Sequence, residues 1–212
     1  MPIRAVICDF GGVLTSPLLG AFAAFQDDTG VSLEQLGRAM EVGAGDLDGR
    51  HPLFELECGR ITEERFLDLL RDGLEIELGH RPELHRFKET YFDALIPNGA
   101  MIDLMAELRD RGLRMVMLTN NVREWEPLWR AKLPVDEIFE SVVDSAFVGM
   151  RKPDYEIYEL TLSRLEGIEP GECLFIDDTE VNCTAARELG IVAVHFRDNE
   201  QAVPEIRSAV DG

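Results

Sequence analysis

The chain has 212 residues, of which 45% are hydrophobic and 29% charged, and its formal net charge is -20 at pH 7. That length allows one substantial core, or a core domain with a smaller insert, and the composition is ordinary for a globular enzyme. The negative charge argues against nucleic-acid binding, because every phosphate would repel an acidic surface. It is typical of a solvated surface that keeps a protein soluble.

The sequence favours a cytoplasmic protein without a membrane segment. No apolar run approaches the ~20 residues that cross a bilayer, and the opening segment lacks the basic-then-apolar pattern of a signal peptide. The four cysteines form no Cys-x-x-Cys pair. Cys8 and Cys173 lie in apolar runs, where reduced and buried thiols are common.

Short apolar runs alternate with helical patterns along most of the chain. The predicted strands cover residues 3–8, 115–118, 141–143, 173–176 and 191–194. Predicted helices, each ending near a glycine, cover residues 101–108, 157–165 and 181–189. The continuous apolar runs favour strands buried on both faces, as in a parallel sheet. The alternation therefore predicts an α/β protein with a doubly wound, Rossmann-like parallel sheet.

Between the first and second predicted strands the pattern is helical only. The predicted helices cover residues 18–26, 33–40, 63–74 and 84–95. Turn signals separate them, and the glycine-rich stretch 43–49 is expected to be a flexible loop or, alternatively, a specificity loop that closes over the site. The sequence thus predicts a core domain made of residues 1–15 and 97–212. An all-helical cap domain of residues 16–96 is inserted after its first strand.

Polar side chains stand where successive predicted strands end. They are Asp9, Thr119, Asn120, Asp177 and Asp178, with Lys152 in the loop after the third strand. In open α/β sheets, ligands bind at the carboxyl ends of the strands. This set suits phosphoryl transfer through a covalent aspartyl phosphate. A carboxylate can attack phosphorus, carboxylates bind Mg²⁺, and a lysine neutralises charge on the transferring group.

Four segments carry a resemblance to a known family. The segments are "ICDFGGVLT" (7–15), "VMLTNN" (116–121), "GMRKPD" (149–154) and "LFIDDTEVN" (174–182). In this order they resemble the four motifs of the haloacid dehalogenase-like hydrolases. The resemblance covers the whole chain, including the cap, and points to the subgroup around the phosphatase domain of soluble epoxide hydrolase. It implies a Mg²⁺-dependent hydrolase of small phosphorylated metabolites.

The resemblance also implies a set of metal ligands. Asp9 would be both the nucleophile and a Mg²⁺ ligand, and the backbone carbonyl of Gly11 would be a second ligand. Asp178 would bind the metal directly, whereas Asp177 would bind it or its waters. Asn182, four residues after Asp178, resembles the residue that supports the metal site from beneath.

For the phosphate, the resemblance implies a separate set of contacts. Thr119 and the backbone of Asn120 would hold the phosphate, and Lys152 would pair with both the phosphate and Asp9.

Trp125 and Trp129 follow the second motif at helical spacing, which favours core packing, with a substrate or cap contact as the second interpretation.

Gly11 departs from the family's phosphatases, where this position holds an aspartate that protonates the leaving oxygen and later activates water. Such general acid–base help contributes about 10²–10⁴-fold. The substrates could have leaving groups that need little protonation, such as acyl or anomeric phosphates. An acid could instead come from the cap, the candidates being Asp46, Asp48, His51 and Glu55.

Two further alternatives stay open. One is a phosphate-binding relative with weak or no turnover. The other is a metal-independent haloacid dehalogenase, which Asp9, Asp177 and Asp178 disfavour because together they suit a metal that this chemistry does not use. The sequence does not reveal the substrate, and it leaves a homodimer open.

Overall fold

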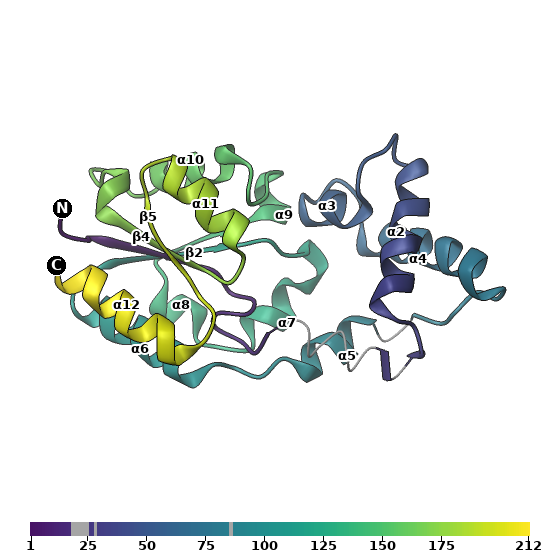
Figure 1. Ribbon diagram of the computed structural model, residues 1–212, viewed down its shortest axis with the longest axis horizontal. Helices are drawn as coiled ribbons and strands as arrows, with labels where there is room; N and C mark the ends of the chain where they lie inside the picture. The colour runs from purple at the N-terminus through teal and green to yellow at the C-terminus, as the bar shows by residue number, and fades with distance from the viewer. Residues whose placement is uncertain (18–25, 28, 85–86) are drawn as a thin grey trace.

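A five-stranded parallel sheet forms the centre of the α/β part of the molecule (Figure 1). The computed structural model describes residues 1–17, 26, 27, 29–84 and 87–212. The strands are β1 (Ala5–Cys8), β2 (Arg114–Thr119), β3 (Ser141–Asp144), β4 (Cys173–Asp177) and β5 (Val192–His195), in the order β3-β2-β1-β4-β5. The predicted doubly wound parallel sheet is confirmed.

The side chains of β1 alternate between the two faces of the sheet. Val6 and Cys8 belong to one apolar cluster, whereas Ala5 and Ile7 belong to the other. All four side chains are fully buried, because helices cover both faces. A central strand covered on both sides has no polar alternation, which explains why its sequence is a continuous apolar run.

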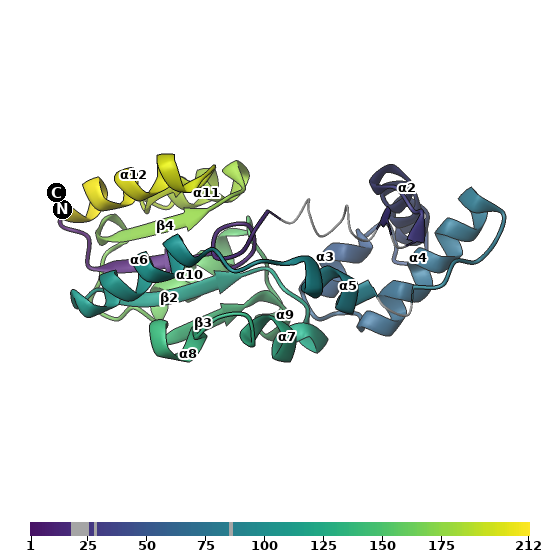
Figure 2. The ribbon, with the colours of Figure 1, turned by 90° about the horizontal axis from the view of Figure 1, so that it is seen from below.

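Helices pack on both faces of the sheet (Figures 1 and 2). Those on the face of Val6 are α6 (Gly99–Asp110), α8 (Val135–Ile138) and α12 (Asn199–Asp211). Those on the face of Ile7 are α10 (Tyr155–Ser163) and α11 (Glu180–Glu188). The connections contain η1 (Arg123–Trp125), α7 (Glu126–Arg130), α9 (Ser145–Val148) and η2 (Pro170–Glu172). No helix in the described part of the chain has the length and apolar character that crossing a membrane requires.

Helix α12, near the C-terminus, was not predicted from the sequence. Asp198 begins it, its side chain accepting a hydrogen bond from the Gln201 backbone at 2.8 Å. Pro204 lies inside the helix and removes one backbone hydrogen bond. Ala202 and Ile206 are fully buried in the core, so packing onto the sheet outweighs that loss.

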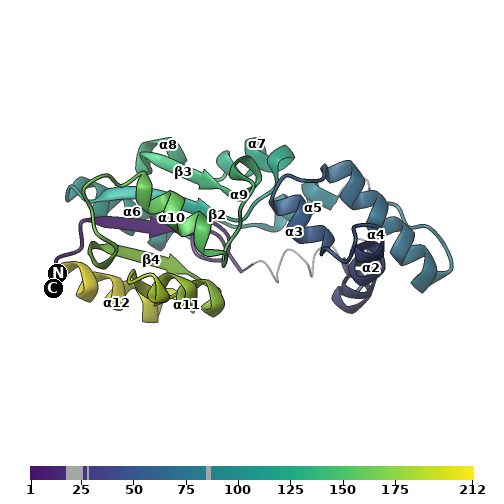
Figure 3. The same cartoon turned by 90° about the horizontal axis from the view of Figure 1, so that it is seen from above.

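The segment between β1 and α6 contains helices and, among its described residues, no strand. Its helices are α2 (Leu33–Gly45), α3 (Pro52–Glu57), α4 (Glu63–Leu78) and α5 (Phe87–Ala94). They lie beyond the carboxyl ends of the strands (Figures 1 and 3). Helices α2 and α4 pack closely, and Gly73 of α4 allows this because it has no side chain. A Cβ atom at Gly73 would lie 2.6 Å from the carbonyl oxygen of Ala39 in α2.

Helix α2 is longer than predicted, which corrects the flexible loop expected at 43–49. Gly43 and Gly45 lie inside the helix, and turns follow only from residue 46. A Cβ atom at Gly43 would lie 3.2 Å from Leu69 of α4. This close packing outweighs the low helix propensity of glycine.

Two other predicted helices and one unpredicted helix complete the segment. The predicted helix 84–95 is present as α5, whereas the predicted helix 18–26 lies outside the described residues except for its last position, Gln26, which is helical. Helix α3 was not predicted. It begins with Pro52 in its first turn, a position where the missing N–H has no helical partner to lose.

The two chain segments that connect the α/β part to the helical segment lie side by side. Thr15 and Pro97 form an isolated antiparallel bridge. The Ser16 N–H donates to the carbonyl of Ile96 at 2.7 Å, and the Asn98 N–H donates to the carbonyl of Leu14 at 2.9 Å. The division into a core and a cap at residues 16 and 96 stays a prediction, and this pairing is compatible with it.

Asp144, at the end of β3, makes stability depend on pH. One oxygen accepts from the Ala146 N–H at 3.0 Å, whereas Oδ2 is buried without a hydrogen-bond partner among the described residues. Burial raises the pKa of this carboxyl from 3.8 to about 6. The folded protein therefore holds a proton that the unfolded chain releases. The free energy of unfolding falls as pH rises through this window.

We expect Asp144→Asn to remove this pH-dependent loss. Between about pH 4 and about pH 8, the free energy of unfolding of the variant should increase by on the order of 2 kcal/mol relative to that of the wild type. Urea unfolding of both proteins at the two pH values measures the difference. A gap between the two proteins that stays constant with pH would contradict the assignment to Asp144.

Candidate active site

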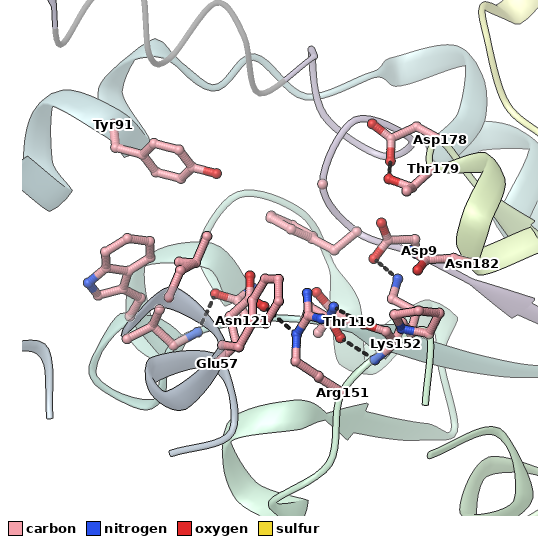
Figure 4. Close-up of a pocket in the computed structure, with 18 of the residues that line it drawn as sticks. Asp9, Glu57, Tyr91, Thr119, Asn121, Arg151, Lys152, Asp178, Thr179 and Asn182 are labelled. Carbon is pink, nitrogen blue, oxygen red and sulfur yellow. Dashed lines mark hydrogen bonds and ion pairs between the residues drawn. The ribbon is translucent and has the colours of Figure 1, made fainter. Parts of the chain in front are cut away.

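The carboxyl ends of β1, β2 and β4 bring predicted site residues together (Figure 4). Asp9 directly follows β1, Thr119 ends β2 and Asp177 ends β4. Lys152 reaches them from the loop between α9 and α10. Its Nζ lies 2.8 Å from Asp9 Oδ1 and 2.6 Å from Asp177 Oδ2. The expected pairing of Lys152 with Asp9 is therefore present, and a second pair with Asp177 adds to it.

The Lys152 side chain is held inside the protein, where it is 1% exposed. Burial alone would lower the pKa of this amine, but Asp177 and Asp9 raise it above its ordinary value, so the amine stays charged. The Asn120 amide fixes the loop from the other side. It donates to the Lys152 carbonyl at 3.0 Å and accepts from the Lys152 N–H at 2.9 Å.

Asp177 is a fully buried carboxylate whose two oxygens are both engaged. Oδ1 accepts from the Thr179 N–H at 2.8 Å and from the Asn182 amide at 3.0 Å, and Oδ2 faces Lys152. Asn182, on α11, thus acts on Asp177 in this structure. The Tyr158 hydroxyl in turn donates to the Asn182 carbonyl at 3.0 Å, which ties α11 to α10.

Asp178 lies against the turn that follows Asp9. A Cβ atom added to Gly12 would lie 2.1 Å from Asp178 Oδ2, and Gly12 has a φ of +77°. Both the left-handed backbone and the close approach require glycine at this position. Gly12 was not among the predicted site residues. Of the two adjacent glycines, Gly11 lines the cavity and Gly12 makes room for Asp178.

Asp9, Asp177 and Asp178 can offer carboxylate oxygens that lie within 4.8 Å of one another. Lys152 pairs with two of these three carboxylates, Asp9 and Asp177, so the cluster holds more carboxylates than its amine can neutralise. Burial raises the pKa of Asp9 to about 7 against the opposing effect of Lys152. Burial and the neighbouring Asp177 also raise the pKa of Asp178. A divalent cation with oxygen ligands would relieve this repulsion, so the residues fit such an ion.

A cavity of about 560 Å³ opens from this cluster toward the helical segment. Its polar end is lined by Asp9, Thr119, Lys152 and Asp178. The apolar lining includes Leu36, Met40, Phe66, Leu70, Phe92 and Trp125. The cavity therefore joins a charged end, built by the sheet, to an apolar end, built largely by α2, α4 and α5.

An ion pair between the helical segment and the loop that follows α9 was not predicted. Arg151, next to Lys152, has its Nε 2.8 Å from Glu57 Oε2 of α3, and its guanidinium lies 3.9 Å from the centre of the Phe54 ring. Burial raises the pKa of Glu57, and Arg151 opposes this rise. Arg151, Glu57 and Phe54 all line the cavity, as does Tyr91, whose hydroxyl points into it (Figure 4).

The four acids considered as replacements for the missing aspartate do not line the cavity in the described part of the chain. Glu55 is buried but pairs with Arg50 at 2.9 Å and Arg60 at 2.8 Å. Asp46 and Asp48 are exposed, and the His51 ring stacks near Phe54 at 4.5 Å. Among its described residues, the helical segment contributes Glu57 and Tyr91 as ionisable side chains instead.

Both tryptophans are buried in the apolar core, as the first interpretation expected, and Trp125 also fits the second one. Trp129 is fully buried and packs on Phe10 with ring centres 5.5 Å apart, as expected for a core residue. Trp125 lines the cavity, packs on Tyr91 and donates to Glu63 of α4 at 2.9 Å. It therefore contacts the helical segment, which was the second interpretation.

A parallel sheet with carboxylates and a lysine at its strand ends matches a known family. The chain belongs to the haloacid dehalogenase-like hydrolases, whose family model matches residues 3–190. The protein is thus a hydrolase of this family, and the predicted resemblance is confirmed.

Several relatives resemble the chain over nearly its full length. A sesquiterpene phosphatase of Aspergillus oryzae is 30% identical, with 98% of this chain and 96% of that protein covered. Bifunctional epoxide hydrolase 2 of Sus scrofa is 28% identical over 97% of this chain, which spans only 38% of that longer protein.

A solved structure of a family enzyme from Bacteroides thetaiotaomicron superposes with a TM-score of 0.72. It is 26% identical, and the match covers 98% of this chain and all of the other. A magnesium complex of the same enzyme superposes with a TM-score of 0.69 at 25% identity, with the same coverage of each chain.

Proposed function

We propose that this protein is a Mg²⁺-dependent phosphatase that hydrolyses small phosphorylated metabolites through a phospho-aspartate at Asp9. The observation that carries the proposal is the Asp9–Lys152 pair beside Asp178 at the polar end of a cavity. The phosphatase name of the Aspergillus relative, which matches nearly the full length of both chains, also supports it.

Two displacements at phosphorus make up the proposed reaction. An Asp9 oxygen forms a bond to phosphorus while the bond from phosphorus to the ester oxygen breaks, and the leaving oxygen carries away the electron pair. Water then attacks the phosphorus of phospho-Asp9, which releases inorganic phosphate and restores the carboxylate. Lys152, the Thr119 hydroxyl and the Asn120 N–H would hold the phosphoryl oxygens.

Mg²⁺ would bind among Asp9, the carbonyl of Gly11 and Asp178, with Asp177 binding the ion or its waters. When bound, the ion supplies positive charge that stabilises negative charge developing on the phosphoryl oxygens. Support comes from the clustered carboxylates, from their excess negative charge and from the magnesium complex of the Bacteroides relative. Asn182 and Lys152 orient Asp177 from opposite sides.

The helices α2–α5 would form the cap that encloses the substrate, with residues 16–96 as the cap domain and the remainder as the core. Contacts of Glu57 with Arg151 and of Glu63 with Trp125 support this role, because they join the two parts beside the cavity. A cytoplasmic location and a homodimer stay predictions.

Release of inorganic phosphate from acetyl phosphate and p-nitrophenyl phosphate, with and without Mg²⁺, tests the proposal. We expect turnover that depends on Mg²⁺ and stops when the ion is chelated. Turnover of a 2-haloacid without metal would favour a dehalogenase instead. No turnover of any phosphate ester at any Mg²⁺ concentration would favour a phosphate-binding relative.

We expect Gly12→Ala to weaken Mg²⁺ binding, because its Cβ would displace Asp178 Oδ2. Disturbing the groups that position metal ligands typically costs about 10–100-fold in affinity. Calorimetric titration with Mg²⁺ measures the effect. Gly167→Ala is the matched control, since Gly167 has a similar φ of +75° and no heavy atom within 4 Å of an added Cβ. Equal Mg²⁺ affinities for both variants would contradict the role of Gly12.

A further inference from the structure

The carboxyl end of β5 lies beside the two aspartates at the end of β4. His195 is the last residue of β5, and its Cα is paired in register with that of Asp177. The Phe196 N–H donates to the Asp177 carbonyl at 2.9 Å. The His195 ring reaches one residue further, and its Nε2 lies 3.0 Å from the carbonyl oxygen of Asp178. Two successive residues of β5 and its end therefore hold the carbonyls of two successive aspartates.

The His195 ring is also held from the side of α11. A carbonyl oxygen only accepts hydrogen bonds, so Nε2 is the donor to Asp178. Nδ1 lies 3.1 Å from Glu180 Oε2, in the first turn of α11. Glu180 Oε1 pairs with Arg187 at 2.6 Å, and Arg187 donates to the Ala193 carbonyl of β5 at 3.2 Å. This chain of contacts begins and ends on β5, so it fixes the position of the ring.

The side chains of the two aspartates are supported differently. Lys152 and Asn182 contact the Asp177 carboxylate directly, at 2.6 and 3.0 Å. Asp178 faces the cavity, and its Oδ1 accepts from the Thr179 hydroxyl at 3.3 Å, which is a longer contact (Figure 4). The direction of the Asp178 carboxylate therefore depends more on the backbone that carries it.

We infer that His195 is a positioning residue for the metal site: it holds the Asp178 backbone so that the Asp178 carboxylate points toward Asp9. The inference rests on the proposed function, in which Asp178 binds Mg²⁺ directly. His195 is not among the described residues that line the cavity, so it would act on the ion only through Asp178. Hydrogen bonds that orient metal ligands typically change metal affinity by about 10–100-fold.

Three substitutions separate the hydrogen bond of His195 from the space that its ring fills. His195→Leu and His195→Phe remove the donor, whereas His195→Gln keeps an N–H of similar reach. The side chain is 32% exposed, so the fold should accept all three. We expect the Leu and Phe variants to bind Mg²⁺ about tenfold or more weakly, and the Gln variant to stay within about threefold of the wild type.

Calorimetric titration of each folded, metal-free variant with Mg²⁺ measures this affinity without turnover. His80→Leu is the matched control, because His80 is an exposed histidine of the helical segment and is not among the described lining residues of the cavity. It should bind Mg²⁺ as the wild type does. Equal losses for the Gln, Leu and Phe variants would indicate a packing role, and wild-type affinity in all three would indicate no role. Either result would overturn the inference.

The Mg²⁺ dependence of p-nitrophenyl phosphate hydrolysis gives a second readout. We expect His195→Leu to need about tenfold more Mg²⁺ for half-maximal rate, with kcat at saturating Mg²⁺ near that of the wild type. A lower kcat at every Mg²⁺ concentration with an unchanged half-maximal concentration would overturn the inference. If the wild type binds Mg²⁺ but hydrolyses no ester, the phosphatase function fails alone and calorimetry still decides the role of His195. A wild type that binds no Mg²⁺ would overturn both proposals.

Discussion

Replacing Asp9 by asparagine is expected to lower the rate of phosphate release by about 10⁴-fold or more, because an amide oxygen does not replace a carboxylate as the nucleophile. The fold should persist. Asparagine has nearly the same shape, and Lys152 keeps its ion pair with Asp177 at 2.6 Å, so its buried amine retains a partner. Single-turnover assays of phosphate release, with thermal unfolding of the variant, measure both effects.

Asp144→Asn is the matched control for this experiment. Asp144 stands at the end of β3 and, like Asp9, is a buried aspartate, but it does not line the cavity in the described structure. The control variant should hydrolyse phosphate esters at the wild-type rate. An Asp9→Asn protein that keeps most of the wild-type turnover would rule out a phospho-Asp9 intermediate, and a loss of activity in both variants would point to a general effect on the fold.

The meeting of Asp9, Thr119 and Asp177 could be predicted because parallel strands end at one edge of a sheet. An apolar run followed by a polar residue marks that edge directly in the sequence. Lys152 was expected near them because it lies in the loop after the third predicted strand, but its pairing with Asp9 came only from the resemblance, since local patterns do not determine the path of a loop. Its second partner, Asp177, emerged from the structure alone.

The cavity beyond the strand ends could not be predicted. Glu57 and Arg151 are 94 residues apart in the sequence, and their contact depends on how α3 packs beside the loop that follows α9. Tyr91 lies on α5, whose helical pattern gives no sign of which face turns toward the sheet. Helix periodicity predicts which residues share a face, but not which neighbour that face meets.

At two places the reason for a glycine could not be predicted from the sequence. Gly43 and Gly45 suggested a loop, yet α2 continues through both because Gly43 lets it pack against α4. Gly12 suggested nothing beyond a turn, yet its missing side chain leaves the space that Asp178 occupies. In both cases the reason for the glycine is a tertiary contact, which the sequence alone does not reveal.

Replacing Gly11 by aspartate is expected to accelerate hydrolysis of alkyl phosphates by about 100-fold, because a carboxyl group there can protonate the departing alkoxide. Acetyl phosphate and p-nitrophenyl phosphate should gain little, since their leaving groups depart without a proton. The backbone can accept the change, because the left-handed residue of the glycine pair is Gly12. Comparing kcat for both classes of ester in the variant and the wild type measures the effect.

Gly11→Asn provides the control, because an amide has a similar shape but is not a proton donor of comparable strength. It should leave the rate for alkyl phosphates near that of the wild type, and the gain of the aspartate variant should disappear at high pH, where the carboxyl group is ionised. An equal gain for both classes of ester, or a slower reaction for both, would contradict a missing general acid. A carboxyl group at position 11 would then not be what the wild type lacks, and Tyr91 and Glu57, the ionisable side chains that the described helices α2–α5 place in the cavity, would be the next candidates for the acid.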